Sequence, residues 1–344
     1  MSPPPSQSHH ALTGVLKLIA TPMQALEDLL TQQRSYFELN VGDYIDYACG
    51  SSGKRLRPML ALLAGGATGN ISSEHIKLGL IVELIHIASL VHDDIMDGAH
   101  VRRERPTLNA KWGNGITVLV GDILFAHALR LSTDFSNKEI SRRIADAAIG
   151  VCSGEMLQTQ RCFDFSLTLE NYYRIIEMKT GSLFAVACEL GGLLNGCSAE
   201  VMTALKQYGN HMGIAYQILD DCIDLLGDEA TFGKTLGTDL SGGKFTLPIL
   251  MLFEATTQGD QAMLHHALLN DKGMNRQTLV KTLLEQGAFR ATMAKFNDLL
   301  DQAEGTLALL SPNDFMQGLG NMVVYLRALA STKVSVFLDS QKTL

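Results

Sequence analysis

Two aspartate clusters of the same form are the residues of this chain best placed to do chemistry. They are Asp93-Asp94-Ile95-Met96-Asp97 and Asp220-Asp221-Cys222-Ile223-Asp224. Each ends an apolar stretch without proline, so a helix is expected, and residues i and i+4 of a helix lie on one face. Asp93 and Asp97 should therefore project together, and so should Asp220 and Asp224. Carboxylates held this close repel one another, and a hard divalent cation would offset that repulsion.

Mg²⁺ is the candidate cation, because it is usually held by one or two carboxylates together with phosphate oxygens and water. Two such clusters facing each other would form a cage for a diphosphate. A lone acidic cluster is more often a solvated helix face. Here the residues preceding the clusters, 84–91 and 214–219, are largely apolar, and half-buried carboxylates need partners.

Basic residues occur at four sites, at breaks or helix ends, from which they could reach a cavity shared with the acidic clusters. Helix starts and Gly-rich loops attract phosphate through free N–H groups. Taken alone, each would more often be ordinary surface charge. Together with the clusters they indicate two polyanions, one bound through metal and one bound directly. The four sites are Lys54 with Arg57, Arg102 with Arg103, Lys179 followed by Thr180, and the pair Lys234 and Lys244.

Composition favours an all-α fold. The chain has 344 residues, of which 46% are hydrophobic. No proline occurs between Pro106 and Pro248, and strand-like alternation is hard to find. A net charge of −8 disfavours nucleic acid, and the scattered cysteines indicate reduced core residues. Helices are predicted over about 11–35, 40–50, 55–66, 73–97, 115–133, 138–162, 169–194, 198–227, 245–257, 275–287, 288–309 and 313–339.

The expected organisation is a disordered tail over residues 1–10 and a single all-α domain over residues 11–344. The tail is rich in proline and serine and lacks the layout of a signal peptide. No membrane span is indicated, since no stretch of about 18 residues stays apolar without polar interruption. The cytoplasm is the default location.

The combination of motifs closely resembles the trans-isoprenyl diphosphate synthases, the polyprenyl synthetase family, from about Gly53 to Pro248. The matching stretches are GKRLRP, DDIMD followed by RR and PT, KT, QILDDCID, GKTLGTD, GGK and TLP. The resemblance implies one large helical bundle with a central cavity, of the isoprenoid synthase type. It also implies about three Mg²⁺ ions per active site, a homodimer, and peripheral membrane contact as a route for product release.

The resemblance assigns roles residue by residue. Asp93, Asp97, Asp220 and Asp224 resemble the Mg²⁺ ligands, with Asp94 and Asp221 as close supports. The isopentenyl diphosphate site corresponds to Lys54, Arg57, His86 and Arg103. The allylic diphosphate site corresponds to Arg102, Lys179, Thr180, Gln217, Lys234 and Lys244. His86 is physically the least expected member, because a histidine among apolar residues is more often part of the core. One departure is Glu104-Arg105, where the family usually has glycine after the paired arginines.

The implied reaction is Mg²⁺-dependent, head-to-tail condensation of isopentenyl diphosphate with an allylic diphosphate into an all-trans polyprenyl diphosphate. The growing chain should follow the helix that precedes Asp93, where Ala88 and Ser89 are small. That helix spans roughly 30 Å, which predicts a product of about 30 carbons or more. A short-chain farnesyl or geranylgeranyl diphosphate synthase is the alternative. A class I terpene cyclase would not need the isopentenyl site, and a non-catalytic partner subunit would be expected to lack one aspartate cluster.

Overall fold

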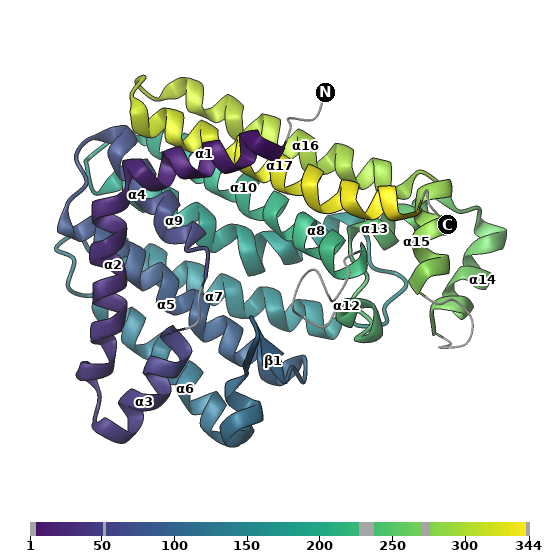
Figure 1. Ribbon diagram of the computed structural model, residues 1–344, viewed down its shortest axis with the longest axis horizontal. Helices are drawn as coiled ribbons and strands as arrows, with labels where there is room; N and C mark the ends of the chain where they lie inside the picture. The colour runs from purple at the N-terminus through teal and green to yellow at the C-terminus, as the bar shows by residue number, and fades with distance from the viewer. Residues whose placement is uncertain (1–4, 51–52, 227–236, 270–275, 342–344) are drawn as a thin grey trace.

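The computed structural model describes residues 5–50, 53–226, 237–269 and 276–341, and almost all of this is helix (Figure 1). The all-α prediction is confirmed. The helices are α1 (Pro5–Leu18), α2 (Ala20–Gln32), α3 (Leu39–Cys49), α4 (Leu56–Thr68), α5 (Ser73–Met96), α6 (Leu108–Ser132), α7 (Lys138–Gln160), α8 (Leu169–Ile176), α9 (Ser182–Leu193), α10 (Ala199–Leu226), α12 (Thr238–Ser241), α13 (Leu247–Ala255), α14 (Gln258–Leu269), α15 (Arg276–Glu285), α16 (Ala288–Thr306) and α17 (Asp314–Gln341). Shorter turns are η1 (Gln33–Tyr36), the π-helical η2 (Glu177–Gly181) and η3 (Leu307–Leu309).

The structure differs from the predicted helices in several places. The predicted helix over 11–35 is divided at Ile19, which leaves helical geometry between α1 and α2. The predicted helix over 169–194 is interrupted by η2, and α6 begins at Leu108, before the predicted start at 115. Residues 258–269 form α14, where no helix was predicted. The helix α1 begins at Pro5, since proline fits the first turn of a helix, where an N–H has no partner. The disordered tail over residues 1–10 and the single domain over residues 11–344 stay predictions.

Two clusters of buried apolar side chains form the core. One is built around α4, α10, α13 and α16, and the other around α5, α6, α7 and α9. Helices α5 and α9 are buried on most of their surface, as expected for helices that are apolar nearly all round. Helix α9 packs between α4 and α10, while α5 packs against α6 and α4. Helices α1, α16 and α17 lie together along one edge (Figure 1). The long helices α5 and α10 thereby carry both aspartate clusters.

A small hairpin follows the first cluster, where no strand was predicted. Strand β1 (Val101–Arg102) pairs antiparallel with β2 (Arg105–Pro106), with Arg103 and Glu104 at the turn. Both turn residues have positive φ, 51° and 63°. Two-residue hairpin loops favour this geometry because its twist matches that of the strands, and glycine adopts it without strain. Glu104 therefore holds the chain in a conformation that glycine would adopt more easily.

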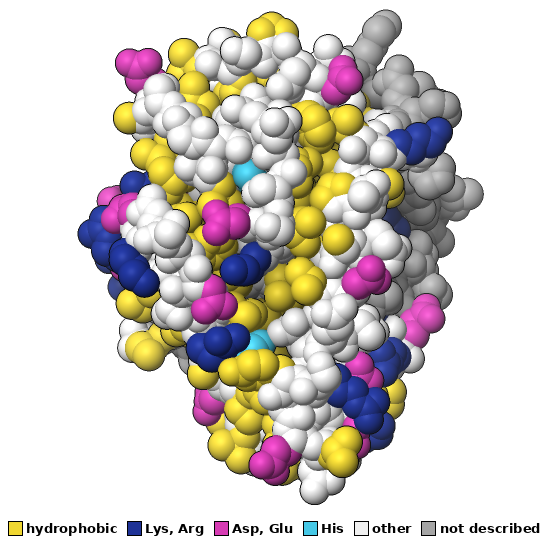
Figure 2. All heavy atoms as spheres, turned by 90° about the vertical axis from the view of Figure 1, so that its left-hand side faces the viewer, with side chains coloured by type: hydrophobic (Ala, Val, Ile, Leu, Met, Phe, Trp, Pro, Cys, Tyr) yellow, Lys and Arg dark blue, Asp and Glu magenta, His cyan; other side chains and the backbone are white. Residues whose placement is uncertain are grey.

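The surface shows no large region of one charge on the face seen in Figure 2, where basic and acidic side chains lie among apolar ones. Among the described helices, only α6 is long and apolar enough to cross a membrane, and 39% of its most apolar window is buried. Core helices pass the same test, so this observation assigns no membrane span. It does leave part of an apolar helix uncovered.

Candidate active site

The first aspartate cluster occupies the C-terminal end of α5. Asp94 is buried and accepts a hydrogen bond from Arg102 Nε at 2.7 Å. Asp97 is partly exposed and accepts one from Lys244 Nζ at 2.7 Å. Burial raises the pKa of Asp93 to about 6, against the opposing charge of Lys179. The middle aspartate thus positions an arginine, and the outer two face lysines.

The second cluster ends α10 and belongs to a buried polar network. Asp221 accepts hydrogen bonds from Tyr172 Oη at 2.7 Å and from Gln217 Nε2 at 2.8 Å. The Gln217 carbonyl oxygen in turn accepts one from Thr180 Oγ1 at 2.7 Å. Burial raises the pKa of Asp221 to about 6, although both hydrogen bonds favour the carboxylate. Tyr172 was not predicted, because its place in the network depends on packing between α8 and α10.

The last aspartate of the second cluster lies against the loop that follows. Asp224 Oδ2 accepts a hydrogen bond from the backbone N–H of Asp239 at 3.1 Å, and its other oxygen accepts one from Thr238 at 3.3 Å. Burial raises the pKa of Asp239 to about 8, with further contributions from Asp221 and Asp224. The loop thus adds a further acidic group next to the predicted ligands, and the Lys244 ammonium lies 4.0 Å from its Oδ1.

Two of the predicted lysines, Lys179 and Lys244, lie at the aspartate clusters. Lys179 belongs to the π-helical turn η2, a feature that often marks functional positions in helices. Its ammonium donates to Gln158 Oε1 at 2.8 Å and forms an ion pair with Glu155, both on α7. Burial alone would lower the pKa of Lys179, but Asp93 and Glu155 raise it above its usual value. Lys234, predicted to share this role, lies outside the described residues.

Glu155 and Gln158 were not predicted. They lie three residues apart on α7 and so share a helix face, a spacing that many solvated helices also have. Nothing in the sequence links them to Lys179. Their function becomes visible only when α7 packs against η2.

The predicted isopentenyl diphosphate residues gather at the start of α4. Arg57 is buried, its guanidinium lies 4.6 Å from the centre of the Phe184 ring, and its Nε has no hydrogen-bond partner in the described part of the chain. Arg103 packs on Gly53, where an added Cβ would lie 2.7 Å from Arg103 Nη1. Burial lowers the pKa of both Arg57 and Lys54. Positive charge is therefore buried here, and an anion would compensate it.

His86 lies at the same place. Burial lowers its pKa well below the usual value, and the positive charges of Arg57, Arg103 and Arg102 lower it further. Its imidazole is therefore neutral and can donate or accept a hydrogen bond. The sequence-based assignment of His86 to this site agrees with its surroundings, and its role stays a prediction.

The start of α4, between Lys54 and Arg57, is anchored by the arginine that precedes the helix. Arg55 has a left-handed backbone, with φ of 50°. Its guanidinium is buried and donates to Glu83 at 2.8 Å and to Glu27 at 2.9 Å. These carboxylates hold Arg55 inward, while the neighbouring Lys54 lines the solvent-open hollow that Asp220 also lines.

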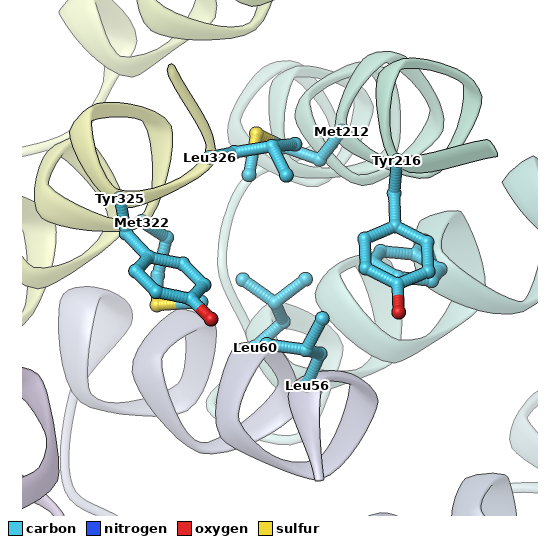
Figure 3. A pocket seen from close by; sticks show the side chains of 8 residues that line it. Leu56, Leu60, Met212, Tyr216, Met322, Tyr325 and Leu326 are labelled. Carbon is cyan, nitrogen blue, oxygen red and sulfur yellow. The ribbon is translucent and has the colours of Figure 1, made fainter. Parts of the chain in front are cut away.

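An apolar pocket adjoins this basic group (Figure 3). Leu56 and Leu60 of α4, Met212 and Tyr216 of α10, and Met322, Tyr325 and Leu326 of α17 line it together with Phe184. A neighbouring hollow of about 560 Å³, open to solvent, is lined by Lys54 and Asp220 among others. The basic group of α4 and the second aspartate cluster of α10 therefore border one space.

The predicted chain-length residues lie on α5, before the first cluster. Ala88 is fully buried in the core formed with α6 and α7. Ser89 is half-buried, and its hydroxyl donates to the carbonyl oxygen of His86 at 2.8 Å. Both side chains are small, as the argument for a path along α5 requires, and Ala88 is packed among the apolar side chains of this core.

The donor set suits a hard cation. Carboxylate oxygens are the ligands that Mg²⁺ prefers, and here ammonium groups already rest on them. Within the ranges that the structure describes, no three His, Cys, Asp or Glu side chains converge closely enough to hold an ion by themselves.

Comparisons with known proteins identify the family of this chain. The family model for polyprenyl synthetase matches residues 39–286. Octaprenyl diphosphate synthase of Escherichia coli (strain K12) is 34% identical over 277 residues, covering 79% of this chain and 85% of that protein. A polyprenyl synthase from Caulobacter crescentus CB15, solved with calcium and isoprenyl diphosphate, superposes with a TM-score of 0.85 at 30% identity, covering 92% of this chain and 97% of the other.

A geranylgeranyl pyrophosphate synthetase from Pyrococcus horikoshii Ot3 gives a TM-score of 0.84 at 27% identity, covering 91% of this chain and 98% of the other. The matched residues include both aspartate clusters and every basic site described above. The chain belongs to the polyprenyl synthetase family.

Proposed function

We propose that this chain condenses isopentenyl diphosphate head to tail with an allylic diphosphate, in a Mg²⁺-dependent reaction, to make an all-trans polyprenyl diphosphate of about 30 carbons or more. The observation that carries the proposal is that two unlike charged sites meet at one hollow, which Lys54 and Asp220 both line. One site is the pair of aspartate clusters, where Lys244 forms an ion pair with Asp97. The other is the buried basic group, in which Arg57 Nε has no hydrogen-bond partner among the described residues.

The acidic site would bind the allylic diphosphate. About three Mg²⁺ ions, held by Asp93, Asp97, Asp220 and Asp224, would neutralise charge on the leaving diphosphate and so favour breaking of the C–O bond. Lys179 and Lys244, with Arg102 held by Asp94, would bind the diphosphate oxygens directly. Positioned positive groups of this kind are commonly the largest contribution to catalysis.

The basic site would bind isopentenyl diphosphate. Lys54, Arg57 and Arg103 would hold its diphosphate, and the neutral imidazole of His86 would add a hydrogen bond. The double bond is then held against the allylic carbon, which is a proximity effect. The Thr180 hydroxyl donates a hydrogen bond to Gln217 Oε1, so the lone pairs of the hydroxyl oxygen would be available to face developing positive charge. The released diphosphate can take the proton that leaves.

A medium or long product is supported by the small residues Ala88 and Ser89 and by likeness to an octaprenyl diphosphate synthase. A short product is the second candidate, because a geranylgeranyl synthetase has the same fold at lower identity. Cyclase and non-catalytic subunit readings are less favoured, since Lys54, Arg57 and both aspartate clusters are present.

A homodimer is part of the proposal. Large apolar side chains are exposed on α6 and α7, among them Leu119 at 57%, Ile149 at 64% and Met156 at 62%. On α7, Ile149 and Met156 lie seven residues apart and share a face. A second copy would cover these side chains. A cytoplasmic location and peripheral membrane contact stay predictions.

Steady-state kinetics with both substrates test the assignment. Asp93→Ala and Asp220→Ala should each lower turnover by a factor of about 10³ or more, whereas Asp28→Ala, on the exposed side of α2, should not. Lys54→Ala and Arg57→Ala should raise mainly the KM for isopentenyl diphosphate, while Lys234→Ala and Lys244→Ala should raise mainly that for the allylic substrate. Near-normal turnover of either aspartate variant, or one shared KM effect for all four basic variants, would overturn the two-site assignment.

A further inference from the structure

Phe163 joins two segments that are far apart in the sequence. It lies in the loop after α7, and its backbone N–H donates to the carbonyl oxygen of Gly243 at 2.8 Å. Its ring rests directly on Gly243, where an added Cβ would lie 2.5 to 2.6 Å from three ring carbons. Gly243 also has a positive φ of 74°. The contact therefore requires glycine at position 243, both for space and for backbone conformation.

Phe163 is not a core residue, so burial does not account for a phenylalanine at this position. Its side chain is 53% exposed, and its backbone is left-handed, with φ of 59°. A bulky residue in that conformation is strained and persists only where the surroundings hold it. Such strain is common at functional positions.

The loop around Phe163 is stabilised by hydrogen bonds among its own residues. Asp164 accepts hydrogen bonds from the backbone N–H and the hydroxyl of Ser166, and from Arg161 at 2.6 Å. These contacts fix the residues on both sides of Phe163. The phenylalanine is therefore a firm support, and the Gly242-Gly243-Lys244 loop rests on it.

Lys244 follows directly after the supported glycine. Its N–H donates to the carbonyl oxygen of Asp239 at 2.7 Å, and its ammonium donates to Asp97 Oδ1 at 2.7 Å. The N–H groups of Gly242 and Gly243 donate to the carbonyl oxygens of Thr238 and Leu240, so the turn is also held from within its own segment. Phe163 adds a contact from a different segment to a glycine pair that is otherwise free of side chains.

We propose that Phe163 is a positioning residue for Lys244. Its ring and its N–H hold the Gly242-Gly243 backbone, so that the Lys244 ammonium stays at the first aspartate cluster. This inference rests on the proposed function, in which Lys244 binds the allylic diphosphate. Phe163 itself touches neither substrate in this scheme.

The test compares Phe163→Ala with Phe163→Tyr, which keeps the ring. Phe163→Ala should raise the KM for the allylic diphosphate about tenfold and leave the KM for isopentenyl diphosphate within about twofold. Phe163→Tyr should restore wild-type values. Met263→Ala is the control, because it removes another exposed apolar side chain, 66% exposed, on α14.

A second readout is independent of chemistry. Hydrogen exchange at the Lys244 amide, which is bonded to Asp239, should be about tenfold faster in Phe163→Ala than in the wild type or in Met263→Ala. Unchanged exchange would overturn the inference, and so would equal changes in both KM values. If Lys244→Ala left the allylic KM unchanged, the proposed function of Lys244 would fail, while exchange would still decide whether Phe163 holds the loop.

Discussion

At the scale of single residues, the aspartates within each cluster have different partners, although the two clusters share one sequence pattern. The outer aspartates of the first cluster face lysines, while the middle ones are occupied, Asp94 by Arg102 and Asp221 by Tyr172 and Gln217. The Asp94 carboxylate accepts one such hydrogen bond and Asp221 accepts two, so both middle aspartates hold neighbouring side chains in place. Asp224 also accepts two hydrogen bonds, but from the loop that follows α10.

Tyr172→Phe tests this division. The change removes one donor from buried Asp221, so we expect the free energy of unfolding to fall by about 1–3 kcal/mol. Turnover should fall about tenfold, because Asp221 orients Gln217 and through it Thr180. Urea denaturation and steady-state kinetics measure both effects. Tyr173→Phe is the matched control, since its hydroxyl has no hydrogen-bond partner among the described residues. Equal behaviour of the two variants would mean that Asp221 does not depend on Tyr172.

Residue types and local spacing identified some residues of the candidate site and could not identify others. The i, i+4 aspartates, Lys179 and Arg57 follow from spacing, charge and the motifs around them. Tyr172, Glu155 and Phe163 act through partners far away in the sequence, and each could be ordinary on its own helix or loop. Their roles depend on which helices pack together, which a single sequence does not state.

At the scale of elements, long apolar helices were predictable and their irregularities were not. Helix α5 was predicted over 73–97 and runs from Ser73 to Met96, since Ser72 caps it and reciprocal hydrogen bonds join Ser72 to His75. The π-helical turn at Lys179 contains Gly181, and Pro22 lies in the first turn of α2, just after the division at Ile19. Both residue types weaken or end helices, but a single glycine or proline also occurs within the first turn or the interior of continuous helices, so neither irregularity was predicted.

Helix α5 also carries the prediction on product length. Ala88→Phe should shorten the product to about 15 to 20 carbons, because a ring one turn before Asp93 fills the path of the growing chain. The rate of the first condensation should persist, since the diphosphate sites are untouched. Chromatography of dephosphorylated products decides the question.

Ala88 is fully buried, so the ring also risks overpacking the core at a cost of about 1–3 kcal/mol. Ser89→Phe, at a half-buried position, provides a second variant, and Ala291→Phe on the exposed side of α16 provides the control. A wild type that already stops near 15 carbons, or unchanged products in both α5 variants, would place the barrier elsewhere.

At the scale of the whole molecule, most large apolar side chains are buried in the core, but several on α6 and α7 are exposed. Helix α6 is apolar enough to span a membrane, yet only 39% of its most apolar window is buried. Apolar side chains exposed together on neighbouring helices mark an interaction surface. A two-fold dimer would place this surface against itself, so that each exposed side chain meets an apolar partner.

If the exposed apolar surface of α6 and α7 is a dimer interface, charged substitutions there should dissociate the dimer. Leu119→Asp combined with Ile149→Asp puts four like charges into a two-fold interface, and desolvating them opposes association strongly. Sedimentation should then show a monomer of about half the wild-type mass, with its helical circular dichroism intact, because both side chains are already exposed in the single chain. Met263→Asp on α14, where the side chain is 66% exposed, should leave the mass unchanged. A wild type that sediments as a monomer, or a double variant that stays dimeric, would assign these side chains to another partner.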